Sequence, residues 1–365
     1  YTMFPLWIRS HADLPLKTYQ IVNTFRYETK QTRSFIRVRE IHFFEAHTAH
    51  IDEADATKQI EEDLAIVQNL MNELKLPVLV TKRPVWDTFP GAWYTIGIDV
   101  IMPDGRTLQV ASCHHYRDQW AKAFDVTYES ESGEQEFVHQ TTYGMSERLL
   151  GAIVATHGDD QGLIMPPSVA PIQVVVIPIM AKKAAEDVIS EAEKLVFQLK
   201  ESGIRARLDA RDIRPGQKYY DWEIKGVPLR IELGPRDLAN DSFMCARRTG
   251  GKESHPLSNL VSAVNNELNS IGEEMSKRSR KHFSFSTRIL PKFTVDGDNL
   301  VFDEPIDSSY VYEMAFKGND AEAQMIEENT GLVFLGNSTS KYSKPKTCVM
   351  SGKPTHNRVY LAKTY

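Results

Sequence analysis

The sequence of 365 residues has little cysteine, no long apolar run and no large excess of one charge. Its three cysteines, Cys113, Cys245 and Cys348, are far apart and odd in number, which argues against a disulfide framework and fits a reducing compartment. The longest apolar run, residues 174–180, is far too short to cross a membrane. The chain opens without a basic and apolar leader, so we expect a cytoplasmic protein that does not bind membranes.

The overall charge excludes little. With 43 basic and 49 acidic residues the formal net charge is −6, so a polyanion would have to meet a local basic patch. Bulk charge therefore neither supports nor excludes a nucleic-acid partner. A hydrophobic content of 41% and a charged content of 25% are typical of a globular protein, and the length predicts two or three domains.

The segment from Phe25 to His50 mixes arginines with apolar and aromatic residues. Near residues 36–44 the side chains follow a period of two, with Arg37 and Arg39 on the face opposite to Ile36, which predicts a β-strand. An arginine beside aromatic residues in a sheet is costly to desolvate unless its guanidinium meets an anion. These arginines therefore indicate either an anion site or surface salt bridges with nearby glutamates.

The pattern along the chain predicts helices and strands in both halves. The expected elements are a helix after Asp52, strands over residues 78–80, 95–102, 107–113, 172–179, 204–208, 227–233 and 243–247, and helices ending at Gly203, over 216–225 and over 258–275. The alternation after residue 171 predicts a small α/β domain with a mostly parallel sheet. Three prolines within residues 166–171 predict a domain boundary there.

The segment Gln109–His115 ends a predicted strand and contains a cysteine beside two histidines. Cys113, His114 and His115 could be metal ligands, but neighbours in a strand point to opposite faces and no Cys-x-x-Cys accompanies them. Packing or hydrogen bonds to a substrate are therefore favoured over a metal.

Two segments further along carry weaker patterns. Asp159 and Asp160 beside glycine fit either a metal site or a turn, and Ser146 with His157 and Asp159 has the composition of a hydrolase triad. No nucleophile elbow surrounds Ser146, so the triad is not favoured. Arg148 follows a turn with glycine and precedes small apolar residues, which is consistent with contact to a phosphate or a base.

In this order the segments resemble the class II aminoacyl-tRNA synthetases, and most closely the prolyl-tRNA synthetases of the archaeal and eukaryotic type. The resemblance is carried by FRYETKQTRSFIRVRE, QVASCHH, GMSER, HGDDQGLIMPPSVAP and DARDIRPGQKYYDWEIKGVPLRIELGPRD, and it covers essentially the whole chain. It implies an antiparallel-sheet catalytic domain over residues 1–168, an α/β anticodon-binding domain over 169–276 and a small α+β C-terminal domain over 277–365. The family's motif 1 and the Thr-x-Glu after it have no counterpart, so we expect an N-terminal part to be missing.

The resemblance also implies the residues of each site. Arg26, Arg37 and Arg148 would be catalytic. ATP would be bound by Arg26, Glu28, Arg37, Glu40, Gln109, Ser112 and Arg148. Proline would be bound by Phe43, Glu45, His47, Phe89, Ser112, His114 and Ser146. The anticodon would be bound by Lys218, Glu223, Arg230, Glu232 and Arg236.

The implied reaction is ATP-dependent activation of L-proline to prolyl-adenylate and transfer to tRNA(Pro) by a homodimer. ATP and Mg²⁺ would take part, and no zinc is expected because Cys348 is alone in the C-terminal segment. One alternative is a non-catalytic tRNA-binding or regulatory protein built on a degenerate synthetase, which the missing motif 1 supports and the intact arginines oppose. Another is a related synthetase for threonine, glycine, serine or histidine.

Overall fold

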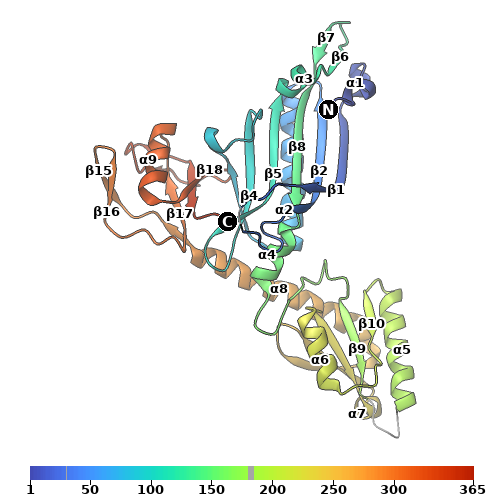
Figure 1. The fold of residues 1–365 in the computed structure, drawn as a ribbon. Helices are drawn as coiled ribbons and strands as arrows, with labels where there is room; N and C mark the ends of the chain where they lie inside the picture. Colours follow the sequence, from blue (N-terminus) through green and yellow to red (C-terminus); the bar gives the residue numbers. More distant parts are fainter. Residues whose placement is uncertain (30, 180–184) are drawn as a thin grey trace. The chain divides into compact units, whose positions relative to one another are not determined.

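The computed structural model describes residues 1–29, 31–179 and 185–365 (Figure 1). They form two compact units: unit 1 contains residues 1–70, 77–152 and 282–365, and unit 2 contains residues 71–76 and 153–281. The division into three domains at residues 168 and 276 stays a prediction, and the residues after 281 share unit 1 with the N-terminal residues. Within the described ranges, no helix combines the length and apolar character that a membrane span requires.

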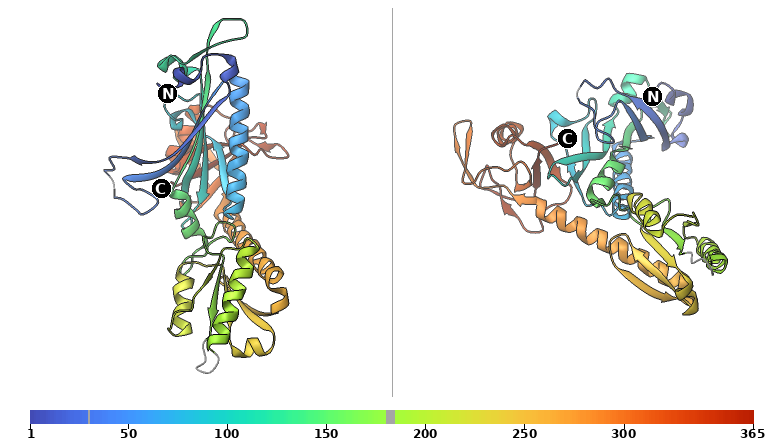
Figure 2. Two further views of the ribbon diagram at one scale, coloured as in Figure 1. Left: turned by 90° about the vertical axis from the view of Figure 1, so that its right-hand side faces the viewer. Right: turned by 60° about the horizontal axis from the view of Figure 1, so that its bottom comes forward.

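Unit 1 is built on a ten-stranded sheet in the order β1-β2-β8-β5-β4-β3-β18-β21-β17-β14 (Figures 1 and 2). Its strands are β1 (Leu16–Phe25), β2 (Glu40–His50), β3 (Val78–Lys82), β4 (Tyr94–Ile101), β5 (Thr107–Arg117), β8 (His139–Ser146), β14 (Thr287–Ile289), β17 (Val311–Ala315), β18 (Val333–Ser338) and β21 (Arg358–Ala362). Neighbours are antiparallel except β14 and β17, which run parallel. The expected antiparallel sheet is therefore confirmed.

The sheet of unit 1 is accompanied by three small hairpins and several helices. The small hairpins are β6 (Thr127–Glu129) with β7 (Gln135–Phe137), β15 (Phe293–Asp296) with β16 (Asn299–Phe302), and β19 (Lys346–Thr347) with β20 (Pro354–Thr355). The helices are α1 (Phe4–Trp7), α3 (Gln119–Phe124) and α9 (Asp320–Thr330), with parts of α2 (Glu53–Glu73), α4 (Arg148–His157) and α8 (Leu260–Ser286). Figures 1 and 2 show α2 along one face of the sheet, where it buries Ala56, Ile60 and Val67. The opposite face is left for the cavity described below.

The strand predicted over residues 36–44 is wrong in its first half. β2 begins at Glu40, and residues 34–36 form a turn that is closed by the hydrogen bond from Arg37 N–H to Arg33 C=O at 2.8 Å. Phe35 adopts φ 61° there, in the left-handed region. Alternation of apolar and charged residues cannot separate a strand from a turn whose apolar side chains line a cavity.

A buried ion pair joins β3 and β4 to the C-terminal strands. The Arg83 Nη2 atom donates to both carboxylate oxygens of Asp99, at 2.9 and 2.7 Å, and Nη1 donates to the Leu335 C=O of β18 at 3.1 Å. Gly97 is required beside them, because a Cβ atom would lie 2.2 Å from the Arg83 guanidinium. Arg83 and its partner Asp99 therefore link strands β4 and β18, which are far apart in the sequence, through one buried ion pair.

Unit 2 holds a five-stranded sheet in the order β10-β9-β11-β12-β13. Its elements are β9 (Val174–Pro178), β10 (Ala206–Leu208), β11 (Leu229–Leu233), β12 (Ser242–Arg247), β13 (Lys252–Pro256), α5 (Ala185–Glu201), α6 (Pro215–Ile224) and α7 (Pro235–Ala239). Only β10, β9 and β11 are parallel, so the mostly parallel sheet of the prediction is half antiparallel. Val174 and Val176 pack with α5 and α8, whereas Val175 packs with Trp222 of α6, so helices cover both faces.

The acidic turn after α4 is closed by an ion pair within unit 2. Asp159 and Gly162 form an isolated bridge, and the Arg248 guanidinium contacts the Asp159 carboxylate at 2.5 and 3.0 Å. This hydrogen bonding outweighs burial and lowers the pKa of Asp159 to about 2. Of the two alternatives for this segment, the turn is confirmed.

Candidate active site

A cavity of ≈ 790 Å³ opens on the face of the unit 1 sheet formed by β2, β8, β5 and β4. Most of the residues predicted to bind ATP or proline line it: Arg26, Glu28, Arg37, Phe43, Glu45, Phe89, Gln109, Ser112, His114, Ser146 and Arg148. The predicted residues Glu40 and His47 do not line it. Glu40 instead accepts a hydrogen bond from Asn23 at 2.7 Å, and His47 lies behind Glu45.

Two rows of residues across the sheet explain this assembly. In one row Glu45, Gly144, Ser112 and Gly97 lie opposite one another on β2, β8, β5 and β4. In the next row, two residues further along, lie His47, Thr142, His114 and Thr95. Residues two apart in a strand share a face, so both rows point the same way. The sheet register therefore brings together residues that are far apart in the sequence, such as Glu45 and Ser112, which lie on either side of Gly144.

One end of the cavity concentrates positive charge. Arg148 opens α4, and its guanidinium donates to two backbone carbonyls, that of Ile36 at 2.9 Å and that of Gln109 at 3.2 Å. Burial, and then the neighbouring charges of Arg26 and Arg37, hold the pKa of Arg148 below its usual value. Arg37 pairs with Glu28 at 3.1 Å. Guanidinium groups gathered in this way favour an anion with several oxygens.

The other end combines an anion with aromatic walls. Burial raises the pKa of Glu45, but the hydrogen bonds from His47 and Gln20 outweigh it, so the carboxyl pKa lies below its usual value. The Phe89 ring lies 4.7 Å from the His114 ring between centroids, and Phe43 lines the same cavity. This end therefore suits a small apolar group that carries a positive charge.

His114 is a neutral side chain of this cavity. Burial, opposed only in part by the charge of Glu45, lowers its pKa to about 4. Its Nδ1 atom lies 2.9 Å from Thr95 Oγ1 and its Nε2 atom 3.0 Å from Ser112 Oγ. Cys113, between these two residues in β5, is buried on the other face, so the segment does not assemble a metal site.

Sequence reasoning missed several residues that line the cavity, namely Thr24, Arg83, Trp86, Asp87, Thr95, Tyr116 and Glu147. Only Glu147 carried a signal, since it lies inside the segment Gly144–Arg148. Its Oε2 atom is buried and accepts no hydrogen bond from the described residues. The others belong to no motif and reach the cavity through the sheet register or the loop before β4.

Three of the five residues predicted to bind an anticodon form one cluster in unit 2. Arg230 pairs with Glu223 at 3.1 Å and with Glu232 at 3.0 Å, and its guanidinium lies 3.9 Å from the Tyr219 ring centroid. Lys218 is 1% exposed and donates to the Asp209 C=O at 3.1 Å. Arg236 is exposed on α7, outside this cluster. The anticodon roles stay predictions.

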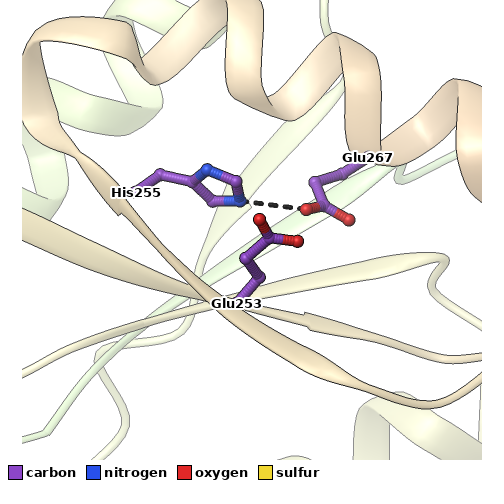
Figure 3. Close-up of side chains that lie close together, drawn as sticks. All are labelled: Glu253, His255 and Glu267. Atoms are coloured by element: carbon purple, nitrogen blue, oxygen red, sulfur yellow. Dashed lines mark hydrogen bonds and ion pairs between the residues drawn. The ribbon is translucent and has the colours of Figure 1, made fainter.

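Among the described residues, one group of three has the geometry for a metal ion. Glu253 and His255 of β13 and Glu267 of α8 point toward one another, with His255 Nε2 and Glu267 Oε1 at 2.9 Å (Figure 3). Burial raises the pKa of Glu267, but its bonds with Arg247 and His255 outweigh this and lower it. Because Arg247 already supplies the positive charge that Glu267 needs, the group carries no metal assignment.

Comparison with known proteins agrees with this geometry. Residues 1–157 match the class II core domain of tRNA synthetases (G, H, P, S and T), and residues 173–267 match an anticodon binding domain. The proline–tRNA ligase of Thermococcus kodakarensis is 47% identical over 371 residues, covering 100% of this chain and 76% of its own. That of Methanocorpusculum labreanum is 46% identical over 358 residues, covering 97% and 74%.

A solved structure is also similar. The prolyl-tRNA synthetase of Giardia lamblia in complex with prolyl-adenylate superposes with a TM-score of 0.91 at 31% identity, covering 100% of this chain and 77% of that one. Both units therefore have the folds that the resemblance implied.

The buried histidines predict how stability depends on pH. Burial lowers the pKa of His114, His115 and His157 to about 4 each, below the value of about 6.5 in an unfolded chain. Between these values the unfolded state binds more protons, so the free energy of unfolding should fall as pH decreases from about 6.5 to about 4. The variant His114→Gln lacks one of these three histidines. Its free energy of unfolding should therefore fall less over this pH range, by roughly one third of the fall that the three histidines cause together. Urea unfolding at several pH values measures it, and an unchanged pH dependence would contradict a neutral His114.

Proposed function

The chain belongs to the prolyl-tRNA synthetase family, and from this premise we propose that it activates L-proline with ATP and transfers the prolyl group to tRNA(Pro). The observation that carries the proposal is the polarity of the cavity: three arginines at one end, and an anionic glutamate with aromatic walls at the other. These ends suit the triphosphate of ATP and the pyrrolidine of proline.

The reaction follows from this arrangement. A carboxylate oxygen of proline attacks the α-phosphorus of ATP, and the bond to the β-phosphate oxygen breaks, which gives prolyl-adenylate and pyrophosphate. Negative charge develops on the phosphate oxygens, and fixed guanidinium groups stabilise it most where water is excluded. Arg26, Arg37 and Arg148 are assigned to this end, and Gln109 to the nucleotide beside it.

The amino-acid end selects its ligand by charge and shape. Glu45 would accept from the protonated ring nitrogen of proline, since its carboxyl pKa is held low. Phe43 and Phe89 would enclose the ring methylenes, and Ser112, His114 and Ser146 would supply hydrogen bonds. His47 is assigned to hold Glu45, which it contacts at 2.9 Å. Glu40 lies outside the cavity lining, so its predicted role in ATP binding rests on the resemblance alone.

Mg²⁺ fits the same cavity. The buried Oε2 atom of Glu147 accepts no hydrogen bond from the described residues, and carboxylate oxygen is the ligand that Mg²⁺ prefers. Glu147 would therefore hold the ion, which would supply positive charge to the ATP phosphates. No zinc is assigned to the chain.

Unit 2 is assigned to the anticodon. Arg230 and its two glutamates present donors and acceptors beside Tyr219, and bases of an anticodon loop are unstacked, so edges and faces are both open to recognition. The predicted anticodon role of Lys218 rests on the resemblance alone, since its buried ammonium group donates to the Asp209 C=O. We further propose a cytoplasmic homodimer. The non-catalytic alternative is disfavoured, because a protein that only binds tRNA has no need of the arginine end of the cavity.

The activation step is tested by amino-acid-dependent ATP–pyrophosphate exchange in the full-length enzyme. Proline should support exchange, whereas threonine, glycine, serine and histidine should not. Arg148→Ala should reduce the rate about 100-fold or more, as expected for loss of a group that stabilises developing charge. Arg33→Ala is the control, because this exposed arginine, from the segment that also carries Arg37, lies outside the cavity lining. Exchange with another amino acid, or none with any, would contradict the proposal.

The tRNA step is tested by charging kinetics. Arg236→Ala should raise the KM for tRNA(Pro) roughly tenfold, the effect of losing one charged hydrogen bond. Proline-dependent pyrophosphate exchange should stay unchanged, because the residue lies in unit 2. Lys200→Ala, another exposed cation of unit 2, serves as control and should leave both activities unchanged. An equal rise in the KM of both variants would point to general electrostatic attraction and overturn the assignment of Arg236.

A further inference from the structure

Thr95 belongs to no motif, yet it links two elements of the cavity. It lies in β4, is 3% exposed, and accepts a hydrogen bond from the Phe89 backbone N–H at Oγ1, at 2.9 Å. The same Oγ1 atom lies 2.9 Å from His114 Nδ1. One hydroxyl group therefore fixes the loop that carries the Phe89 ring and the imidazole against which that ring packs.

The direction of these hydrogen bonds follows from their first member. A backbone N–H can only donate, so the Thr95 oxygen accepts there. His114 Nδ1 is the other hydrogen-bond partner of this hydroxyl among the described residues, so it is the acceptor available to the Thr95 proton. With Nδ1 accepting, a neutral imidazole carries its proton on Nε2, which then donates to Ser112 Oγ at 3.0 Å. The Ser112 hydroxyl proton remains for an acceptor in the cavity, which Ser112 lines.

We propose that Thr95 is a positioning residue: it sets the tautomer of His114 and thereby makes Ser112 a hydrogen-bond donor toward an oxygen of the bound amino acid or its adenylate. This inference rests on the proposed function for the identity of the ligand. A carboxylate or carbonyl oxygen accepts from such a donor, whereas the protonated ring nitrogen does not. The hydrogen bonds from Thr95 through His114 to Ser112 thus orient the amino acid, with its nitrogen toward Glu45 and its reacting oxygen toward Ser112.

The surroundings of His114 are consistent with a neutral imidazole in a single tautomer. Burial keeps its pKa near 4, so the imidazole has one proton and one acceptor nitrogen at neutral pH. Among the described residues, Thr95 Oγ1 is hydrogen-bonded to Phe89 N–H and to His114 Nδ1. Thr95 itself lies opposite His114 in the register of β4 and β5, which keeps the pair in contact.

The tautomer is measured by nitrogen-15 NMR of ring-labelled histidines in the full-length enzyme without substrate, with His114 identified by the signals absent from His114→Gln. We expect a protonated Nε2 and an unprotonated Nδ1 in the wild type and in Thr95→Ser. In Thr95→Val, where the hydroxyl is replaced by a methyl group of similar size, the preference for this tautomer should be lost. A wild type with the proton on Nδ1 would overturn the proposal even if Thr95→Val failed to fold.

Kinetics provide the second readout. Thr95→Val should raise the KM for proline in pyrophosphate exchange roughly threefold to tenfold, the effect of one misdirected hydrogen bond. The KM for ATP should stay within about twofold, and Thr95→Ser should restore the KM for proline. An unchanged tautomer and KM in Thr95→Val would overturn the proposal. Absence of proline-dependent exchange in the wild type would instead overturn the proposed function, and the substrate-free NMR result would still decide the role of Thr95.

Discussion

The site depends on one arginine that is held by backbone rather than by a carboxylate. The Arg148 guanidinium donates to the carbonyls of Ile36 and Gln109, which fix its direction without neutralising its charge. A half-buried cation without a carboxylate partner is costly unless an anion approaches it. The turn around Phe35 and the beginning of β5 supply these two carbonyls, so the conformation of the turn determines where the Arg148 charge lies.

The sheet register places the acidic end of the cavity away from its arginine end. Cross-strand rows place Glu45 and Ser112 around Gly144, and a Cβ atom at Gly144 would lie 2.8 Å from the Phe43 ring. Because Gly144 has no side chain, the cavity has room for a ligand ring between the Glu45 carboxylate and the Phe43 ring. Arg83 lines the same cavity but is paired with Asp99, so its charge is neutralised within the protein and does not compete for the phosphates.

Much of the site could be predicted from the sequence, because segments such as QVASCHH and GMSER contain several of the polar side chains that line the cavity. Residues whose role comes from pairing could not. Thr95 meets His114 only through the register of two strands, and Arg83 meets Leu335 of β18 across more than half of the chain. The turn at residues 34–36 was misread as a strand, since apolar and charged residues alternate there although the consecutive residues 35–38 all line the cavity.

The measurement that tests this account most directly is equilibrium binding of ATP to Arg148→Lys by titration calorimetry. Lysine keeps the charge but has no planar fork to bond two carbonyls and a phosphate at once. If the direction of the guanidinium is what matters, the Kd for ATP should rise about tenfold or more relative to the wild type. If charge alone attracts the nucleotide, the two affinities will be equal, and the central place given to Arg148 would be wrong.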